Sequence, residues 1–228
     1  MQDAPIRPPV IALTMWLNAQ RAGHISATDA ANACEFITES LDVWHGDRGA
    51  KWTELITLVQ QVDRPCVAVL PTMGDPSGLP IGILSSLRIQ AGAVAIGQDL
   101  ILYQNQNLVW SLHQHPHTVT QPDHSFSRQM FLEGLERATK TLTSADLIGD
   151  RSKVESLLDA LPGSHFPPTA DVRLMNFMEQ ATRVRVVARA ALGESMAIAS
   201  RSADSTRVDA LQEIDALARQ LITAIASH

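Results

Sequence analysis

The clearest pattern of hydrophobic and polar positions lies in the last third of the chain. From residue 171 to 191 apolar residues recur at spacings of three and four, and the same spacing returns from 205 to 225. That period places the apolar side chains of each segment on one face of a helix. The sequence therefore predicts two long amphipathic helices, joined around 196–204 as a helical hairpin.

Helical spacing also occurs in the earlier part of the chain. Ser26 and Asp29 form a capping pair that opens one helix, and Asp123 or Ser125 is placed to cap another. The segment 42–52 contains two glycines and is expected to be a loop. The expected helices cover 10–22, 26–39, 50–62, 81–91, 126–143 and 151–160.

Runs of β-forming residues interrupt these helices. A short run after Pro65 predicts a buried strand at 66–70, and residues 93–113 read as a meander of three strands. The order of elements indicates an α+β fold, in which a small, mostly antiparallel sheet packs with helices and a long helical hairpin ends the chain. The proline-rich stretch 161–168 predicts a boundary between an α+β part at 1–160 and the hairpin at 169–228, the two packed as one globular unit.

Composition and charge then narrow the function classes. A chain of 228 residues with 45% hydrophobic and 18% charged residues is typical of a globular protein with a sizeable core. The net charge of -6 argues against nucleic-acid binding, which needs a basic surface. No segment approaches the ~18 apolar residues of a membrane span. The apolar run 10–17 fits a first helix better than a signal peptide, because Asp3 and two prolines precede it. We expect a cytoplasmic protein.

Two cysteines bear on the compartment and on redox chemistry. Cys34 falls in an expected helix and Cys66 at the start of an expected strand, where cysteines are usually buried thiols. A disulfide between them is the alternative, although a chain of this size does not require one.

The first candidate site is the strand, loop and helix at 66–91, which begins VAVLPTMGDPSGLP over 67–80. Free backbone N–H groups and the dipole at a helix start suit an anion. The carboxylate of Asp75, however, would repel a phosphate group. The alternative interpretation of the loop is a rigid turn fixed by proline and glycine. The candidate ligand-binding residues are Thr72, Gly74, Asp75, Ser77 and Gly78.

Within this loop, LPTMG at 70–74 resembles the start of the pantoate–β-alanine ligase signature. In that family the run leads into two histidines, spaced H-x-G-H, that contact nucleotide phosphates. Here Ser77 and Pro80 stand at the histidine positions and Leu79 replaces the glycine. The groups that would stabilise developing negative charge are missing, so we reject this assignment.

A broader stretch of the chain resembles a different family. The order VLPTMGDPSGLP, AGAVAIGQDLILY and LVWSLH is similar to a family of actinobacterial proteins of unknown function, over roughly 10–160. Because that family has no assigned activity, the resemblance implies no catalytic residue.

The second candidate site is a group of histidines. His113, His115 and His117 alternate, so on an extended strand they share one face and can bind a divalent metal such as zinc, nickel or iron. His124 or Asp123 would complete the ligand shell. The alternative is a set of solvated histidines in a polar loop, because Pro116 breaks strand geometry.

Arginines on the first helix of the hairpin are a third feature. Arg173, Arg183, Arg185 and Arg189 could bind an acidic partner or phosphate groups. The alternative is a solvated face whose arginines pair with Glu179, Glu194 or acids of the last helix, where exposed pairs contribute only ~0–1 kcal/mol.

Two function hypotheses follow, and the sequence does not decide whether the protein is an enzyme. The first is a non-enzymatic binding or scaffold protein that forms a homo-oligomer, or binds a protein partner, through residues 171–226. The second is an enzyme that binds a small molecule or metal in a pocket between loop 72–80 and the segment His113–His117.

Overall fold

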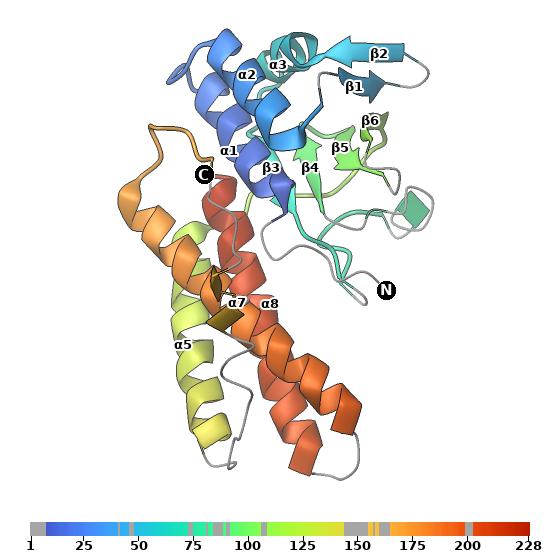
Figure 1. The fold of residues 1–228 in the computed structure, drawn as a ribbon. Coiled ribbons are helices and arrows are strands. Elements are labelled where there is room, and N and C mark those ends of the chain that lie inside the picture. The colour runs from blue at the N-terminus through green and yellow to red at the C-terminus, as the bar shows by residue number, and fades with distance from the viewer. Residues whose placement is uncertain are drawn as a thin grey trace. The chain divides into compact units, whose positions relative to one another are not determined.

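The chain forms two compact units (Figure 1). The first unit comprises Met1–Pro122, Ser164–Asp171 and Ala226–His228, and the second comprises Asp123–Gly163 and Val172–Ile225. The computed structural model describes residues 8–40, 42–45, 48–72, 75–80, 82–83, 89, 92–105, 109–143, 155–156, 158–159, 165–198 and 203–228.

The helices of the first unit follow the signals in the sequence. They are α1 (Pro9–Arg21), α2 (Ala27–Thr38) and α3 (Trp52–Gln60). Ser26 caps α2 as predicted, because its hydroxyl accepts the Asp29 N–H at 3.1 Å. Glu39 ends that helix with a φ of 51°, in the left-handed region.

The sheet of the first unit has six strands in the order β2-β1-β6-β5-β4-β3. Neighbouring strands are antiparallel except β1 and β6, which are parallel. The α+β fold, the mostly antiparallel sheet and the meander are thus confirmed. The strands are β1 (Asp42–His45), β2 (Arg48–Lys51), β3 (Val67–Val69), β4 (Ala93–Ile96), β5 (Leu100–Gln104) and β6 (Trp110–Gln114).

The loop predicted at 42–52 is wrong. Residues 42–45 and 48–51 form the antiparallel strands β1 and β2, in which Trp44 pairs with Gly49, and Trp52 begins α3. Trp44 also pairs with Ser111 of β6. The local sequence is poor in strand signals. Pairing with the distant strand β6, and not local propensity, holds this hairpin in the sheet.

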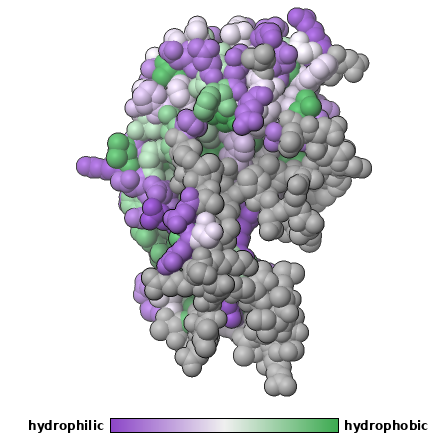
Figure 2. All heavy atoms as spheres, in the orientation of Figure 1, coloured by the Kyte–Doolittle hydropathy of each residue, from purple (hydrophilic) through white to green (hydrophobic). Residues whose placement is uncertain are grey.

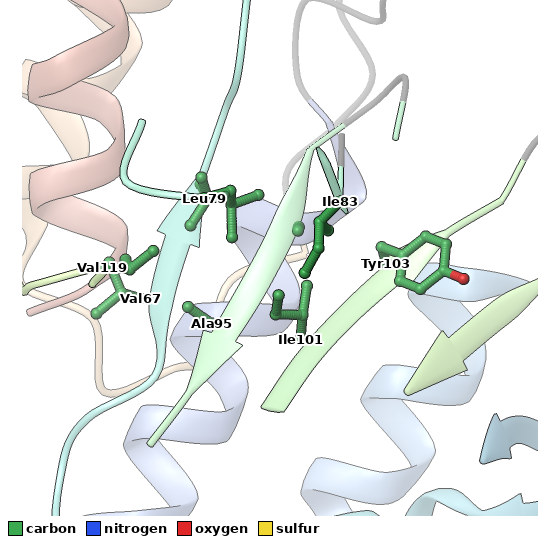
Figure 3. Packing of buried hydrophobic residues seen from close by; sticks show 9 residues of the cluster. Val67, Leu79, Ile83, Ala95, Ile101, Tyr103 and Val119 are labelled. Carbon is green, nitrogen blue, oxygen red and sulfur yellow. The ribbon is translucent and has the colours of Figure 1, made fainter. Parts of the chain in front are cut away.

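Strand register divides the core between two faces of the sheet. On one face lie Trp110 and its neighbours, and the Trp110 ring packs edge-on against Trp52 of α3, with centroids 6.4 Å apart. The other face carries Val67, Val69, Ala93, Ala95, Ile101 and Tyr103, and it packs against Leu79, Ile83 and Val119 (Figure 3). The loop predicted as a ligand site therefore covers the face opposite to α3.

Two polar side chains fix elements to β3. Asn18 of α1 is buried, its Nδ2 donates to the Cys66 carbonyl at 2.9 Å and its Oδ1 accepts the Cys66 N–H at 2.7 Å. Ser227 is also buried, and its hydroxyl accepts the N–H of Ala68 at 3.0 Å. Its carbonyl accepts a second bond from Gln121 Nε2 at 2.7 Å. The strand is thus bonded to segments from both ends of the chain.

The helices of the second unit whose bounds the structure describes are α5 (His124–Thr143), α7 (Val172–Ile198) and α8 (Ala203–Ala226). Of the two predicted caps for α5, Asp123 is the one used, because its Oδ1 accepts the N–H groups of Ser125 at 2.8 Å and Phe126 at 3.2 Å. α7 and α8 form the predicted hairpin (Figure 1). A Cβ on Gly134 of α5 would meet the side chain of Leu217, so the missing side chain lets α5 approach α8 closely.

The division of the chain differs from the predicted boundary. α5 belongs with the hairpin, and the stretch 164–171, which overlaps the expected boundary at 161–168, belongs to the first unit. His165 explains this: its carbonyl accepts the Trp16 Nε1–H at 2.7 Å, and its ring packs edge-on against Phe36. Of the helix predicted at 81–91, residues 82–83 are helical, and most of the rest lies outside the described residues. Residues 155–156 and 158–159 of the helix predicted at 151–160 are helical.

Candidate functional site

The loop at 72–80 is a tight turn whose polar groups bond to one another. Thr72 and Asp75 exchange backbone hydrogen bonds of 2.9 and 3.0 Å. The Asp75 carboxylate accepts the Ser77 N–H at 2.8 Å. It therefore uses a backbone donor that an anion would need. Ser77 and Gly78 have φ values of 51° and 84°, and Gly74 lies outside the described residues.

This turn lies beside the segment that follows His117. Thr118 Oγ1 donates to the Gly78 carbonyl at 3.4 Å, and a Cβ on Gly78 would lie 3.2 Å from Val119 Cα. Leu79 and Val119 are buried beside Val67 (Figure 3). The structure thus brings the loop against residues 118–119, which directly follow the histidine segment, and packed side chains fill this contact.

Two of the candidate metal ligands share a face of the sheet. His113 pairs with Ile101, so it projects from the same face as the core around Val67. The rings of His113 and His115 are stacked, with centroids 6.4 Å apart and planes 20° from parallel. His115 Nδ1 lies 2.7 Å from the Pro116 carbonyl oxygen, so Nε2 is the ring nitrogen that would have to bind a metal.

The other two histidines have different surroundings. Both ring nitrogens of His117 are buried, and burial is the main cause that lowers the pKa of His117. The Leu100 backbone and Asp99 act in the opposite direction. His124 begins α5, in the second unit. In the part of the chain that the structure describes, no three His, Cys, Asp or Glu residues are grouped so as to hold a metal ion.

The cysteines are buried free thiols, as the sequence predicted. Burial raises the pKa of Cys66 to about 12 and also raises the pKa of Cys34. A thiol is nucleophilic only as thiolate, so neither side chain is suited to nucleophilic catalysis near neutral pH.

The arginines of α7 fall into two groups. Arg183 is exposed and pairs with Glu179 at 2.8 Å, as predicted. Arg185 and Arg189 pair with Asp215 of the last helix, with each Nε directed at the same Oδ1, at 3.2 and 3.3 Å. The prediction of a solvated face is wrong for Arg185, whose side chain is only 3% exposed.

We call Arg185, Arg189, Asp215 and Arg219 the arginine cluster. The sequence did not identify Asp215 and Arg219. Asp215 and Arg219 lie four and eight residues after Leu211, at positions of the apolar face of α8. Charged residues at apolar positions were the available signal. Burial lowers the pKa of Arg185 to about 10; the charges of Arg189 and Arg219 act in the same direction, and Asp215 acts against them.

A depression lies along α5. It has a volume of about 530 Å³ and is lined by Ser125, Phe126, Arg128, Gln129, Leu132 and Glu133. Phe126 is 63% exposed and Leu132 is 46% exposed. Figure 2 shows hydrophobic side chains among hydrophilic ones on the face in view. The depression therefore combines apolar contact surface with one charge of each sign.

Comparison with known proteins gives a family for both parts of the chain. Residues 10–124 match the model of the N-terminal domain of Rv1486c-like proteins, and residues 127–222 match the model of the C-terminal domain of the same proteins. No curated protein and no solved structure matches the chain. None of the helices in the described part is both long and apolar enough for a membrane span.

Proposed function

The chain belongs to the Rv1486c-like protein family, and we propose that it is a non-enzymatic, cytoplasmic binding protein that forms a homodimer through the helices of its second unit. The observation that carries this proposal is the depression on α5, where Phe126 and Leu132 are exposed side by side with polar residues. Exposed aromatic and aliphatic side chains around a concave surface are typical of association sites.

A second copy of the chain is the partner that fits this surface. A twofold interface needs a self-complementary patch, in which each residue meets a different residue of the other copy. Arg128 and Glu133 both line the depression. Two α5 helices packed antiparallel about a point between these residues would place Arg128 of each copy near Glu133 of the other. The apolar residues Phe126 and Leu132 would then be covered on both copies.

The hairpin was predicted to offer its apolar stripe for association, and most of that stripe is buried within the chain itself. Ala181 and Ala188 of α7 and Leu211 and Leu221 of α8 are buried. Among the side chains of α7 that the structure describes, the large apolar residues Val172 and Val187 are exposed. In our proposal α5 supplies the centre of the interface, and these valines of α7 can add to it.

The test compares two phenylalanines of equal exposure. Phe126 and Phe36 are each 63% exposed, on α5 and on α2. We expect light scattering coupled to gel filtration to give a dimer for the natural protein at micromolar concentration. Phe126→Asp should raise the dimer dissociation constant at least tenfold, the effect of about 1.4 kcal/mol, whereas Phe36→Asp should leave it unchanged. A strictly monomeric natural protein, or a dimer unaffected by Phe126→Asp, would refute the proposal.

The alternative is an enzyme that binds a small molecule or metal between loop 72–80 and His113–His117. One observation favours it: Leu79 of the loop packs on the face of the sheet from which His113 projects. We place it second because Asp75 bonds within its own turn and because packed side chains fill the contact at Gly78. A thermal-shift screen with nucleotides, sugar phosphates and divalent metals tests it. A ligand that stabilises the natural protein but not a Ser77→Ala variant would revive it.

A further inference from the structure

A proline-containing segment of the chain, residues 165–168, is bound on the surface of the first unit, and we call it the proline segment. Residues 165–167 lie outside helices and strands. Phe166 and Pro167 each precede a proline, which restricts their backbone to extended conformations. The stretch 164–171 groups with the first unit, whereas the chain before and after it groups with the second. Contacts with the first unit therefore hold the proline segment in place.

Aromatic side chains of two helices contact the proline segment. Trp16 of α1 donates its Nε1–H to the His165 carbonyl oxygen at 2.7 Å. The ring of Phe36 of α2 packs edge-on against the His165 ring, with centroids 4.4 Å apart. Pro167 is buried, whereas His165 and Pro168 are exposed. An extended proline peptide that lies on aromatic side chains is a recurring mode of peptide recognition, because such a peptide loses little entropy when it binds.

The contacts of Trp16 and Phe36 suit more than the chain's own segment. The bond from Trp16 is made to a backbone carbonyl, which every residue carries. The proline segment also covers Phe36 only in part, since 63% of Phe36 remains exposed. An exposed ring beside a bound peptide offers apolar surface to further atoms of a longer ligand. The surface is therefore neither specific for residues 165–168 nor filled by them.

We propose that Trp16 and Phe36 form a binding site for an extended, proline-containing segment of a partner protein, and that the chain's own proline segment competes for this site. A ligand that belongs to the same chain acts at a high effective concentration. It lowers the apparent affinity for a partner by the fraction of molecules in which the site is occupied. The proline segment thus regulates access to the site. The site belongs to the first unit, and the inference does not depend on the proposed dimer.

The probe is the labelled peptide SHFPPTA, the sequence of residues 164–170, with both ends blocked. Fluorescence anisotropy measures its binding to the full chain. Pro167→Ala removes the buried proline of the chain's own segment, so we expect this variant to bind the peptide about tenfold more tightly than the natural protein does. A peptide with alanine at both proline positions should bind about tenfold more weakly. Equal affinities of the two proteins, or of the two peptides, would overturn the proposal.

Two substitutions, each added to Pro167→Ala, locate the site. Trp16→Phe keeps an aromatic ring but removes the N–H group, and it should raise the dissociation constant about fivefold, the effect of losing one neutral hydrogen bond. Trp44→Phe is the matched control, because Trp44 is an exposed tryptophan of β1, and it should leave the affinity unchanged. Full affinity after Trp16→Phe would overturn the assignment of the site.

Amide hydrogen exchange in the natural protein tests the competition without any variant. The Ala170 N–H donates to the Pro167 carbonyl at 3.0 Å, in a turn directly after the proline segment. Saturating unlabelled peptide should displace the segment and accelerate exchange at Ala170, while exchange at Val94 of β4 stays the same. Unchanged exchange at Ala170 would overturn the proposal. Dissociation of a dimer by the peptide in light scattering would also overturn it, because the occupant would then be the proline segment of a second copy.

Discussion

In the first unit, the buried side chains of Asn18 and Ser227 that join elements are neutral, whereas in the second unit the buried Arg185 is charged and shares the carboxylate of Asp215 with Arg189. Asn18 gives and receives a bond at Cys66, and Ser227 receives one at Ala68. Arg185 and Arg189 compete for one oxygen of Asp215. The contrast separates two uses of buried polarity. Neutral hydrogen-bonding side chains fix where elements pack, while two arginines on one carboxylate make the packing of α7 and α8 depend on a single charge.

The largest effect should come from the charged side of this comparison. Asp215→Asn removes the negative charge that opposes the two arginines acting on Arg185, and we expect it to lower the free energy of unfolding by roughly 3 kcal/mol. Urea unfolding measures the change. Asp209→Asn, an exposed position of the same helix, should change stability by no more than about 0.5 kcal/mol. Equal effects of the two variants would show that the cluster is not electrostatically strained.

The neutral clamp at Cys66 should come next. Asn18→Ala leaves the buried N–H and carbonyl of Cys66 without this partner, and we expect a loss of roughly 2 kcal/mol in the same unfolding experiment. The exposed Asn176 of α7 provides the control, since Asn176→Ala should be nearly neutral. If Asn18→Ala were equally mild, reciprocal pairing would not be what fixes α1 to the sheet.

A smaller loss is expected at the edge of the sheet. Ser227→Ala removes the hydroxyl that accepts the Ala68 N–H, and it should cost about 1 kcal/mol. Amide hydrogen exchange sharpens the measurement, because exchange at Ala68 should accelerate more than exchange at Val94, its partner in β4. Unchanged protection of Ala68 would contradict the assigned bond.

The smallest effect concerns pH. The pKa of His117 is lowered in the folded protein, so the unfolded chain takes up a proton first as the pH falls. Stability from this residue is therefore fully present above the ordinary histidine pKa of about 6.5 and is lost as the pH falls below it. His117→Gln should flatten the stability curve between about pH 7 and pH 5. A curve of unchanged slope would contradict the lowered pKa of His117 and would mean that the Leu100 backbone and Asp99, which act against burial, offset it fully.

Helices were predictable because each one carries its own signal. The spacing of apolar residues gave α7 and α8, and Ser26 marked the start of α2 within one residue. The hairpin β1–β2 was not, since its place in the sheet depends on β6, which lies far away in the sequence. The same distinction holds for the grouping of α5 with the hairpin, which follows from the packing of Gly134 against Leu217 and not from the prolines at 161–168.

The candidate sites divide in a similar way. The alternation of His113 and His115 on one face was predictable from strand geometry, and their stacked rings confirm it. The role of Asp75 depends on a bond to a residue two positions away, so the interpretation of this loop as a turn was also open to sequence reasoning. The arginine cluster was only half visible. The sequence places Arg185 and Arg189 on one face of α7, but only the packing of α7 against α8 brings Asp215 to both of them.

The bond between Ala68 and Ser227 also sets an order of events during synthesis. β3 is an edge strand, and an open strand edge is a template for pairing with other chains. Ser227, whose hydroxyl accepts the Ala68 N–H, lies 159 positions further along, so it leaves the ribosome after α5, α7 and α8 have been made. A nascent first unit thus carries an incomplete edge for most of translation. Until the segment around Ser227 has been added, the Ala68 N–H lacks this acceptor and is available for pairing with another chain.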